Sequence, residues 1–264
     1  MSSYKPVIAL LRGLEVLRCV NGMGLATVRA LHEATGADKA TIVRMLETLV
    51  HAGYVRRDDG AGGYRVSGRV LELSLGFDRL RVAADLAAPV LARFRAEIGW
   101  PSDFALRDGD AMIVAETSRE PGPMFLNRKP GFRAPILPTS IGRAYLASCP
   151  SDERAEILSQ LRTRPEGGPS QAEVAAILER VRKTGCAEMD EAYSRSEYEG
   201  VTSALAVPVM DGEGRAHGAL NVMYLRNTMG ADRARRDLLP RLLAAAADLA
   251  AAFREGGFPA GGAG

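Results

Sequence analysis

The sequence predicts an α+β protein with an N-terminal winged helix-turn-helix over residues 1–77 and a C-terminal domain with an antiparallel sheet over residues 78–264. Three observations support this prediction. Apolar residues recur at three- and four-residue steps in the first 52 residues, which indicates short amphipathic helices. A basic stretch with a two-residue period follows and indicates a hairpin. Beyond residue 100, strand patterns in pairs alternate with helical patterns, as in a sheet covered by helices.

The composition is that of an ordinary globular protein. The chain has 264 residues, of which 47% are hydrophobic and 25% charged, and this excludes a disordered or fibrous chain. Its cysteines, Cys19, Cys149 and Cys186, have no metal-ligand spacing, so we expect free thiols in a reducing compartment. No apolar run has the length of a membrane span or the pattern of a signal peptide. We therefore expect a cytoplasmic protein that does not insert into membranes.

Three helices are predicted in the first domain, over residues 6–20, 27–34 and 39–52. The segment Asn21–Gly24 ends the first, because Asn and Gly accept left-handed backbone conformations. Gly36 closes the second helix in the same way, and the Asp38 carboxylate can cap the third by accepting from its free N–H groups. The tight turn between the second and third helices is typical of a helix-turn-helix.

The third helix and the hairpin have the side chains of a DNA-binding surface. Short polar side chains at the leading end of a helix allow it to enter the major groove. Arginines on a hairpin can neutralise phosphates and so supply affinity. We predict DNA contacts by Lys39, Ala40, Thr41, Arg44, Thr48, Arg56, Arg57 and Arg65. Two alternatives stay open: the three helices bind another protein, and Arg44 forms a surface salt bridge with Glu47 or Glu33.

A connector helix is expected after the hairpin, over residues 67–80. Its apolar stripe packs either on its own domain or on a second copy of the chain, and we expect coupling between the domains at Val70, Leu73, Phe77 and Leu80. A further helix is expected over residues 83–98. Gly99 closes it, and Pro89 is expected to kink or restart it.

Strand and helix patterns alternate through the rest of the second domain. Strands are predicted over residues 104–107, 112–115, 125–126, 204–210 and 217–225. Helices are predicted over residues 140–147, 151–161, 171–184 and 233–254, with Pro240 interrupting the last. The Gly- and Pro-rich end of the chain, residues 256–264, is expected to be disordered.

The sequence lacks the motifs of the common enzyme classes, since it has no GxGxxG, P-loop, GxSxG or HExxH pattern. His32, His51 and His217 are spread over both domains, and no histidine is near Cys149 in the sequence. We therefore expect no enzymatic activity, no metal and no cofactor. The second domain is predicted to be a sensor.

Candidate residues for binding a small organic acid are scattered along the second domain. Free N–H groups at a helix start bind anions, an arginine can pair with a carboxylate, and polar residues on apolar strands need partners. The predicted set is Phe104, Met112, Thr139, Ser140, Ile141, Gly142, Arg195, Ser203, Asn221 and Met223. Helix capping, a solvated arginine, backbone hydrogen bonds and core packing are the alternative explanations for these residues.

Several segments, in their order along the chain, resemble the IclR family of bacterial transcription regulators. Ala9–Leu17 resembles the first helix of that family, and Thr35–Leu49 resembles its recognition segment. In the second domain, Pro135–Ala147 resembles the loop and helix of the family's sensor domain, and Ala206–Val209 resembles its closing hairpin. The resemblance implies homodimers, often dimers of dimers, that bind operator DNA. It also implies a GAF-like sensor domain whose ligand is commonly an organic or aromatic acid.

Within the family, the segments Trp100–Asp103 and Leu239–Pro240 look most like the regulator of hydroxyphenylpropionate degradation, which favours an aromatic carboxylate as effector. Two departures from the family pattern change the expected contacts. Ala40 stands where a small hydroxyl residue is common, and Tyr193–Glu197 replaces the usual acidic run. The alternative function is a sensor or assembly protein that uses its winged helix for protein contacts.

Overall fold

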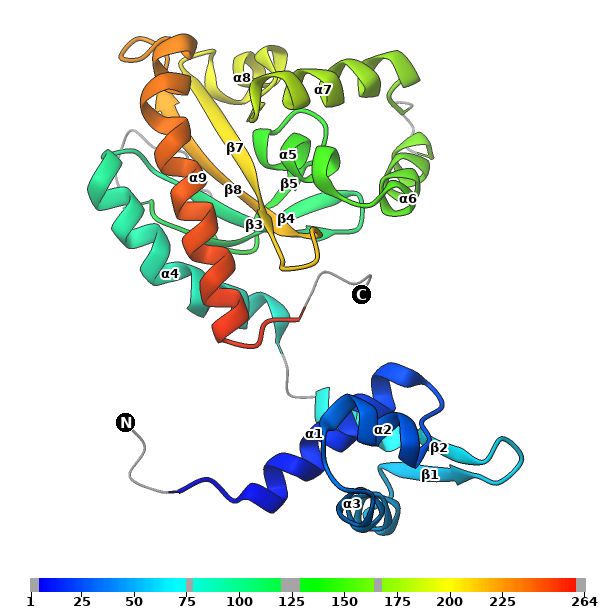
Figure 1. Cartoon of the computed structure of the whole chain (residues 1–264). Coiled ribbons are helices and arrows are strands. Elements are labelled where there is room, and N and C mark those ends of the chain that lie inside the picture. The colour runs from blue at the N-terminus through cyan, green and yellow to red at the C-terminus, as the bar shows by residue number, and fades with distance from the viewer. Residues whose placement is uncertain (1–4, 75–77, 120–128, 164–167, 260–264) are drawn as a thin grey trace. The chain divides into compact units, whose positions relative to one another are not determined.

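The computed structural model describes residues 5–74, 78–119, 129–163 and 168–259. The chain divides into two compact units, Met1–Phe77 and Asp78–Gly264 (Figure 1). Each unit has its own hydrophobic core. None of the helices in the described part of the chain combines the length and the apolar character that a membrane span requires.

Unit 1 is a three-helix domain with a hairpin wing. Its elements are α1 (Ile8–Met23), α2 (Val28–Thr35), α3 (Lys39–His51), β1 (Val55–Asp58) and β2 (Gly63–Val66). The helices pack around fully buried side chains, including Val20, Leu31, Ile42 and Leu46. The predicted end of the first helix was too early: α1 continues to Met23, and Gly24 is the residue that takes a positive φ of 67°.

The predicted continuous helix over residues 67–80 was wrong. A 3-10 helix, η1 (Gly68–Ser74), follows the wing, and α4 (Arg79–Ile98) begins only after Asp78, whose carboxylate accepts a hydrogen bond from the Arg81 N–H. The apolar stripe is consequently divided. Leu73 is 61% exposed in unit 1, whereas Leu80 packs on the core of unit 2; Phe77 lies outside the described residues.

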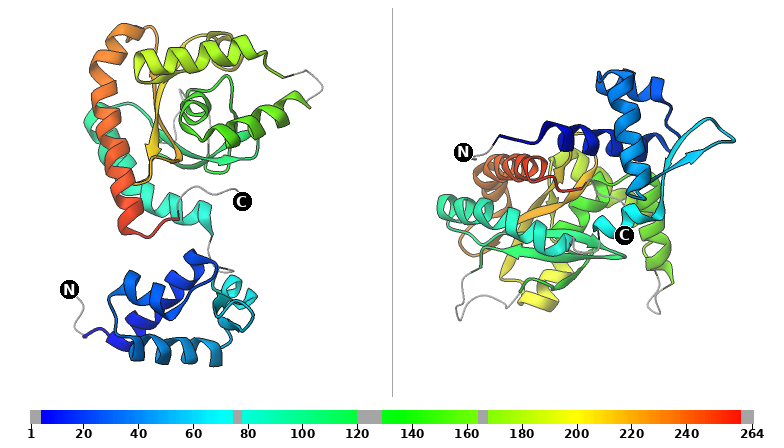
Figure 2. Two further views of the ribbon diagram at one scale, coloured as in Figure 1. Left: turned by 45° about the vertical axis from the view of Figure 1, so that its right-hand side comes forward. Right: turned by 90° about the horizontal axis from the view of Figure 1, so that it is seen from below.

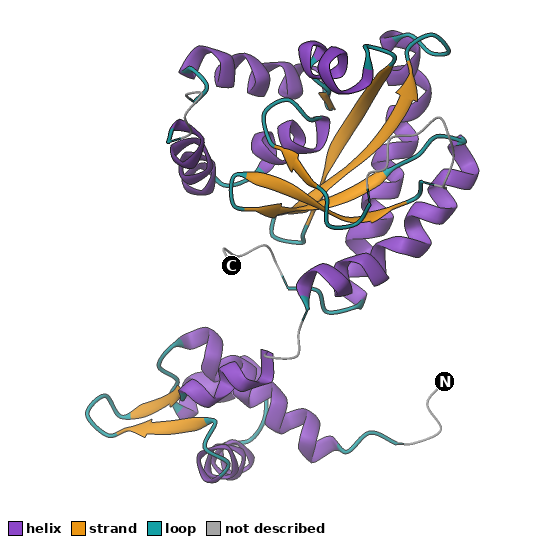
Figure 3. Cartoon of the chain, turned by 180° about the vertical axis from the view of Figure 1, so that it is seen from behind, coloured by secondary structure: helices purple, strands orange, loops and turns teal. Residues whose placement is uncertain are grey.

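The sheet of unit 2 has the strand order β5-β4-β3-β8-β7-β6, with every neighbouring pair antiparallel. Its strands are β3 (Asp103–Asp108), β4 (Ala111–Thr117), β5 (Arg133–Pro135), β6 (Ala187–Glu188), β7 (Thr202–Met210) and β8 (Ala216–Leu225). Figure 3 shows the curved sheet from behind, with helices on both of its faces.

The two faces of the sheet carry different helices. On one face lie α4 and α9 (Ala231–Glu255), side by side in both Figure 1 and Figure 2. On the other face lie α5 (Ser140–Ser148), α6 (Ser151–Arg162) and α7 (Gln171–Thr184). The short helix α8 (Glu191–Tyr198) packs over the start of β7 and the end of β8. Successive strand residues therefore face different helices.

Three short elements of unit 2 were not predicted, and two details of the prediction were wrong. The missed elements are β5, β6 and α8. Pro240 does not interrupt α9: the helix is continuous through Pro240, which lies on its exposed side. The predicted disorder is wrong for residues 256–259: Phe258 is buried and its ring stacks on Phe253 at 4.6 Å. The predicted strand over 125–126 and the last five tail residues lie outside the described residues.

Candidate nucleic-acid interface and ligand site

The turn between α2 and α3 fixes where the third helix begins. Gly36 ends α2 in a left-handed conformation with a φ of 67°, and His32 Nδ1 lies 2.7 Å from the Ala37 carbonyl oxygen. The Asp38 carboxylate accepts hydrogen bonds from the backbone N–H of Thr41 at 2.8 Å and from its hydroxyl at 2.7 Å. These two bonds lower the pKa of Asp38, so the cap is ionised at neutral pH.

The outer face of α3 is exposed and carries unpaired cations. Lys39, Ala40, Arg44 and Thr48 are exposed, and Thr41 is half-buried beside its cap. Within the described residues, neither Lys39 nor Arg44 has a hydrogen-bond or ion-pair partner for its side chain. The predicted alternative for Arg44 is not formed. Glu47 pairs instead with Arg57, and Glu33 pairs with Arg29.

Two of the three arginines of the wing are held by carboxylates. Arg57 forms an ion pair with Glu47 of α3. Arg65 donates to Asp58 at 2.7 Å and to the carbonyl oxygen of Gly24 at 3.1 Å. Arg56 is exposed and forms no ion pair with any described residue. The paired arginines therefore attach the wing to the helices, and Arg56 is available to an external anion.

The ten predicted effector residues are not gathered in one pocket. Phe104 faces α9 and its ring lies 5.2 Å from that of Phe253, whereas Met112 and Ile141 belong to the core on the opposite face. The expected single apolar wall of Phe104 and Met112 is thus not formed, because these side chains lie on opposite faces of the sheet. Arg195 is exposed and pairs with Glu191 at 3.2 Å.

The start of α5 is occupied by its own capping and packing contacts. Thr139 Oγ1 accepts from the N–H of Gly142 at 3.2 Å and donates to the Pro135 carbonyl at 2.6 Å. Ser140 is buried beside it. A Cβ on Gly142 would lie 2.0 Å from the Ile136 carbonyl oxygen, so the backbone approach itself requires glycine. Capping and close packing account for this turn.

A buried polar cluster lies on the sheet at Asn221. Asn221 Oδ1 accepts from the Asp103 N–H at 2.7 Å, and its Nδ2 donates to the Asp103 carboxylate at 3.3 Å. Arg119 forms two hydrogen bonds with the same carboxylate, at 3.0 and 2.8 Å. Burial alone would lower the pKa of Arg119, but the Asp103 charge outweighs this and raises it. Met223, Tyr198 and Met189 form a small apolar cluster on this part of unit 2.

The sequence signal for this cluster was incomplete. Asn221 was singled out as a polar residue on an apolar strand, and its partner is Asp103. Arg119 was missed because it follows β4 in an irregular segment with no periodicity. The general rule that a buried charge needs an opposite charge could have suggested a search for it.

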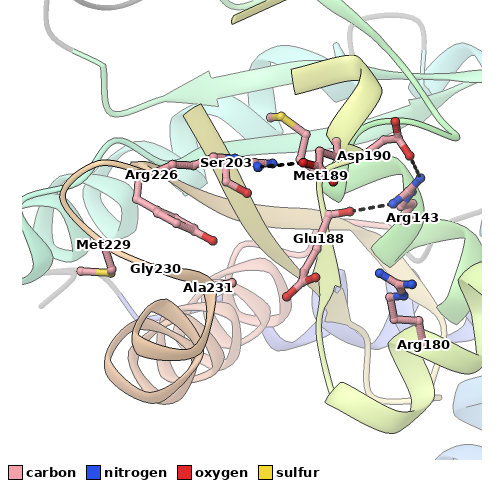
Figure 4. Close-up of a pocket in the computed structure, with 12 residues that line it drawn as sticks. Arg143, Arg180, Glu188, Met189, Asp190, Ser203, Arg226, Met229, Gly230 and Ala231 are labelled. Carbon is pink, nitrogen blue, oxygen red and sulfur yellow. Dashed lines mark hydrogen bonds and ion pairs between the residues drawn. The ribbon is translucent and has the colours of Figure 1, made fainter. Parts of the chain in front are cut away.

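A cavity of about 450 Å³ lies beside β6 within unit 2 (Figure 4). It is lined by the start of β7, the end of β8, the residues after β8, and the first residues of α9. Of the ten predicted effector residues, Ser203 alone lines it. Figure 4 also shows Arg143 bonded to Glu188 and Asp190 at the wall of the cavity.

Comparison with known families decides the class of protein. A family model of the IclR helix-turn-helix domain matches residues 9–59, and a model described as bacterial transcriptional regulator IclR C-terminal matches residues 78–251. The chain belongs to the IclR family. Members of this family are bacterial transcriptional regulators with a DNA-binding helix-turn-helix, and the α+β architecture described above is the IclR fold.

Individual relatives are moderately similar in sequence. The HTH-type transcriptional regulator TsaQ1/TsaQ2 of Comamonas testosteroni is 29% identical over 158 residues, which cover 59% of this chain and 57% of that protein. The Pca regulon regulatory protein of Pseudomonas putida is 27% identical, over 91% of this chain and 82% of its own. The crystal structure of an IclR family transcriptional regulator from Brucella abortus is 26% identical, covers 94% of this chain and 93% of its own, and superposes with a TM-score of 0.52.

Proposed function

We propose that this IclR-family regulator binds an operator in double-stranded DNA by placing α3 in the major groove. The observation that carries the proposal is the pair of exposed, unpartnered cations, Lys39 and Arg44, on a helix whose start is fixed by Asp38. Arginine and lysine side chains are the commonest readers of guanine in that groove. Thr41, Thr48 and the small Ala40 lie on the same helix and allow close approach of the backbone.

The wing would contact the DNA backbone. Arg56 is free to bind a phosphate directly. Arg57 is 54% exposed and Arg65 38% exposed at the side chain, so each can bind a phosphate while its carboxylate partner fixes its position. Contacts of this kind supply affinity without sequence discrimination.

The proposal includes a homodimer, alone or as a dimer of dimers. The first part of α1 leaves an apolar stripe more than half exposed, formed by Val7, Ile8, Leu10, Leu11 and Leu14. An exposed apolar patch of this kind is typical of a protein–protein interface. A second copy of the chain is the occupant that a regulator of a two-fold operator requires.

Unit 2 would sense a small organic acid and carry no catalytic activity. The proposed effector is an aromatic carboxylate, the class favoured by the likeness of Trp100–Asp103 and Leu239–Pro240 to the hydroxyphenylpropionate regulator. The polar cluster at Asn221, with Met223 and Tyr198 beside it, supports a ligand with one polar and one apolar end. An effector changes operator affinity only if it prefers one arrangement of the dimer. Binding to chromosomal DNA places this activity in the cytoplasm.

Fluorescence anisotropy with the DNA upstream of the gene and with a random duplex tests the DNA-binding proposal. Affinity should fall steeply with salt, because phosphate contacts release counterions. Arg44→Ala should weaken operator binding by about 1–3 kcal/mol and blur the preference for operator at one base step. Arg29→Ala is the matched control, since Arg29 is an exposed arginine on α2 that is paired with Glu33.

The docking of α3 would be refuted if Arg44→Ala bound the operator as tightly as the unaltered chain, or if the affinity for DNA did not change with salt concentration. The second result would favour the alternative in which the winged helix binds protein. Calorimetry with a panel of aromatic and keto acids tests sensing separately. The absence of heat with every acid would count against an effector of this class.

A further inference from the structure

The cavity beside β6 has the volume of a small-molecule site and lies apart from the Asn221 cluster. Its volume of about 450 Å³ is within the range of roughly 300–1,000 Å³ that is usual for such sites. Ser203 and Tyr224, which line it, belong to the sheet face covered by α4 and α9. Asn221 and Met223 occupy the alternate positions of β8 and point to the other face.

The first turn of α9 borders this cavity without a capping side chain. Gly230 is the N-cap, and Gly230 and Ala231 line the cavity in Figure 4. Because glycine has no side chain, the first N–H groups of this 25-residue helix receive no side-chain cap within the described part of unit 2. The only acid of the first turn, Asp232, is 86% exposed and pairs with Arg235. Uncapped N–H groups and the helix dipole favour an anion at this position.

Arg226 provides a second, independent indication. It lines the same cavity, and although its side chain is 35% exposed, its Nε is buried without a hydrogen-bond partner among the described residues. Its terminal nitrogen is 3.7 Å from Glu191, which also pairs with Arg195 at a shorter distance of 3.2 Å. A buried donor without an acceptor is unfavourable, and an anion in the cavity is the kind of acceptor that would remove this cost.

The carboxylates around the cavity are already neutralised. Asp190 pairs with Arg143 at 2.8 Å, and Glu188 pairs with Arg235 at 2.9 Å. Glu191, the third carboxylate of the lining, pairs with Arg195 at 3.2 Å. Arg180 has no ion-pair partner within the described residues, and Figure 4 shows its side chain directed toward Arg143 at the cavity wall. The balance of uncompensated charge at the cavity is therefore positive.

Hydroxyl groups and apolar side chains complete the lining. The hydroxyls of Tyr224 and Ser203 belong to this lining. Burial raises the pKa of Tyr224, so its hydroxyl keeps its proton. Met189 and Met229 add apolar surface to the lining. A bare inorganic ion would leave that surface without contacts.

We propose that this cavity is a second ligand site of unit 2, which binds a small organic carboxylate at the start of α9 and at Arg226. The carboxylate would accept from the N–H groups that follow Gly230 and from the Arg226 guanidinium, and its carbon skeleton would lie against Met229. The groups proposed to hold the carboxylate, Arg226 and the start of α9, belong neither to the operator surface nor to the Asn221 cluster, although Met189 borders both the cavity and that cluster. Its failure would leave the proposed DNA binding untouched.

Calorimetry on the full chain, with benzoate, succinate and inorganic phosphate as separate probes, tests this proposal. Benzoate or succinate should bind, and Arg226→Gln should weaken that binding at least tenfold. Gly230→Asp is the sharper variant. Position 230 has a φ of −72° and open space around a Cβ, so an aspartate fits and would cap α9 with its own carboxylate. It should raise the melting temperature of the free protein and weaken benzoate or succinate binding at least tenfold.

Two controls separate this site from the alternatives. Arg182→Gln, on exposed α7 and paired with Glu179, should bind the probes like the unaltered chain. Arg81→Gln, at an exposed position of α4 where Arg81 pairs with Asp85, should also retain this binding. Binding of phosphate alone, no binding of either organic acid, or unchanged binding by Arg226→Gln and Gly230→Asp would each overturn the proposal.

Discussion

Charged side chains have different surroundings in the two units. On the outer face of α3 and on the wing of unit 1, Lys39, Arg44 and Arg56 are exposed and form no ion pair with the described residues. In unit 2, Asp103 is fully buried, and Arg119 is 7% exposed at the side chain and bound to it. An exposed cation is free to exchange water for a phosphate or a base, whereas a buried pair is held by the fold. The difference indicates that the exposed cations are available to an external anion, whereas the buried pair holds the Asn221 cluster in place.

Removing one member of the buried pair should have the largest effect. Arg119→Met leaves the Asp103 carboxylate buried without its cation, so the free energy of unfolding of unit 2 should fall by about 3–5 kcal/mol. Urea unfolding followed by the fluorescence of Trp100, the single tryptophan of the chain, measures this loss. Arg182→Met, which breaks an exposed pair with Glu179, should cost far less. Equal losses of unfolding free energy in the two variants would show that burial does not determine how much an ion pair contributes to stability.

Within the wing, substitution of the unpaired Arg56 and of the paired Arg57 should distinguish a phosphate contact from an ion pair that holds the wing in position. Arg56→Ala should remove one phosphate contact and no other interaction. It should therefore weaken binding to the operator and to a random duplex equally, and reduce by about one the slope of log affinity against log salt concentration. Arg57→Ala also breaks the ion pair with Glu47, so it should lower the affinity for both duplexes further than Arg56→Ala does. Anisotropy titrations at several salt concentrations measure both effects. A sequence-dependent loss in either variant would contradict a purely phosphate-binding wing.

A buried histidine should give unit 2 a smaller, pH-dependent loss of stability. Burial lowers the pKa of His217 from its ordinary value of 6.5; nearby Arg79 and Arg215 also lower it, while Asp211 opposes them. The unfolded chain therefore takes up a proton more readily than the folded chain. Stability should be complete above pH 6.5 and should decrease as the pH falls below that value.

Urea midpoints between pH 8 and pH 5 measure this effect. His217→Phe should remove the part of the decrease that His217 causes, and His51→Gln, at an exposed position in unit 1, should retain it. If His217→Phe follows the same pH dependence as the unaltered chain, other groups are responsible.

Local signals in the sequence were sufficient for the DNA-binding unit. Gly36 ends α2 because glycine, which has no side chain, accepts a left-handed conformation, and Asp38 starts α3 because its carboxylate caps the helix. Both effects depend on nearby residues only. The two-residue period of the wing is similarly local. The long hairpin of β7 and β8 was also predicted, because two apolar runs are joined there by the turn at residues 211–214.

The sheet-face placement of the effector candidates could not be obtained in this way. Phe104 and Met112 both look like apolar strand residues, and only the register of β3 with β4 and β8 places them on opposite faces. β6 has two residues and α8 has a mostly polar sequence, so neither gives a periodic signal. The cavity beside β6 depends on these two short elements and on the distant start of α9. Contacts between residues far apart in sequence create it.

Phe258 packs against Arg79 at the beginning of the second unit. The guanidinium of Arg79 lies 5.5 Å from the ring centre of Phe258, which is also buried against Phe253. A short linker could therefore join these two points and make a closed ring of the domain. New ends could then be opened at the exposed turn Gly212–Gly214 between β7 and β8. Such a circular permutant would carry unit 2 without the helix-turn-helix and would leave the Asn221 cluster and the cavity beside β6 uncut.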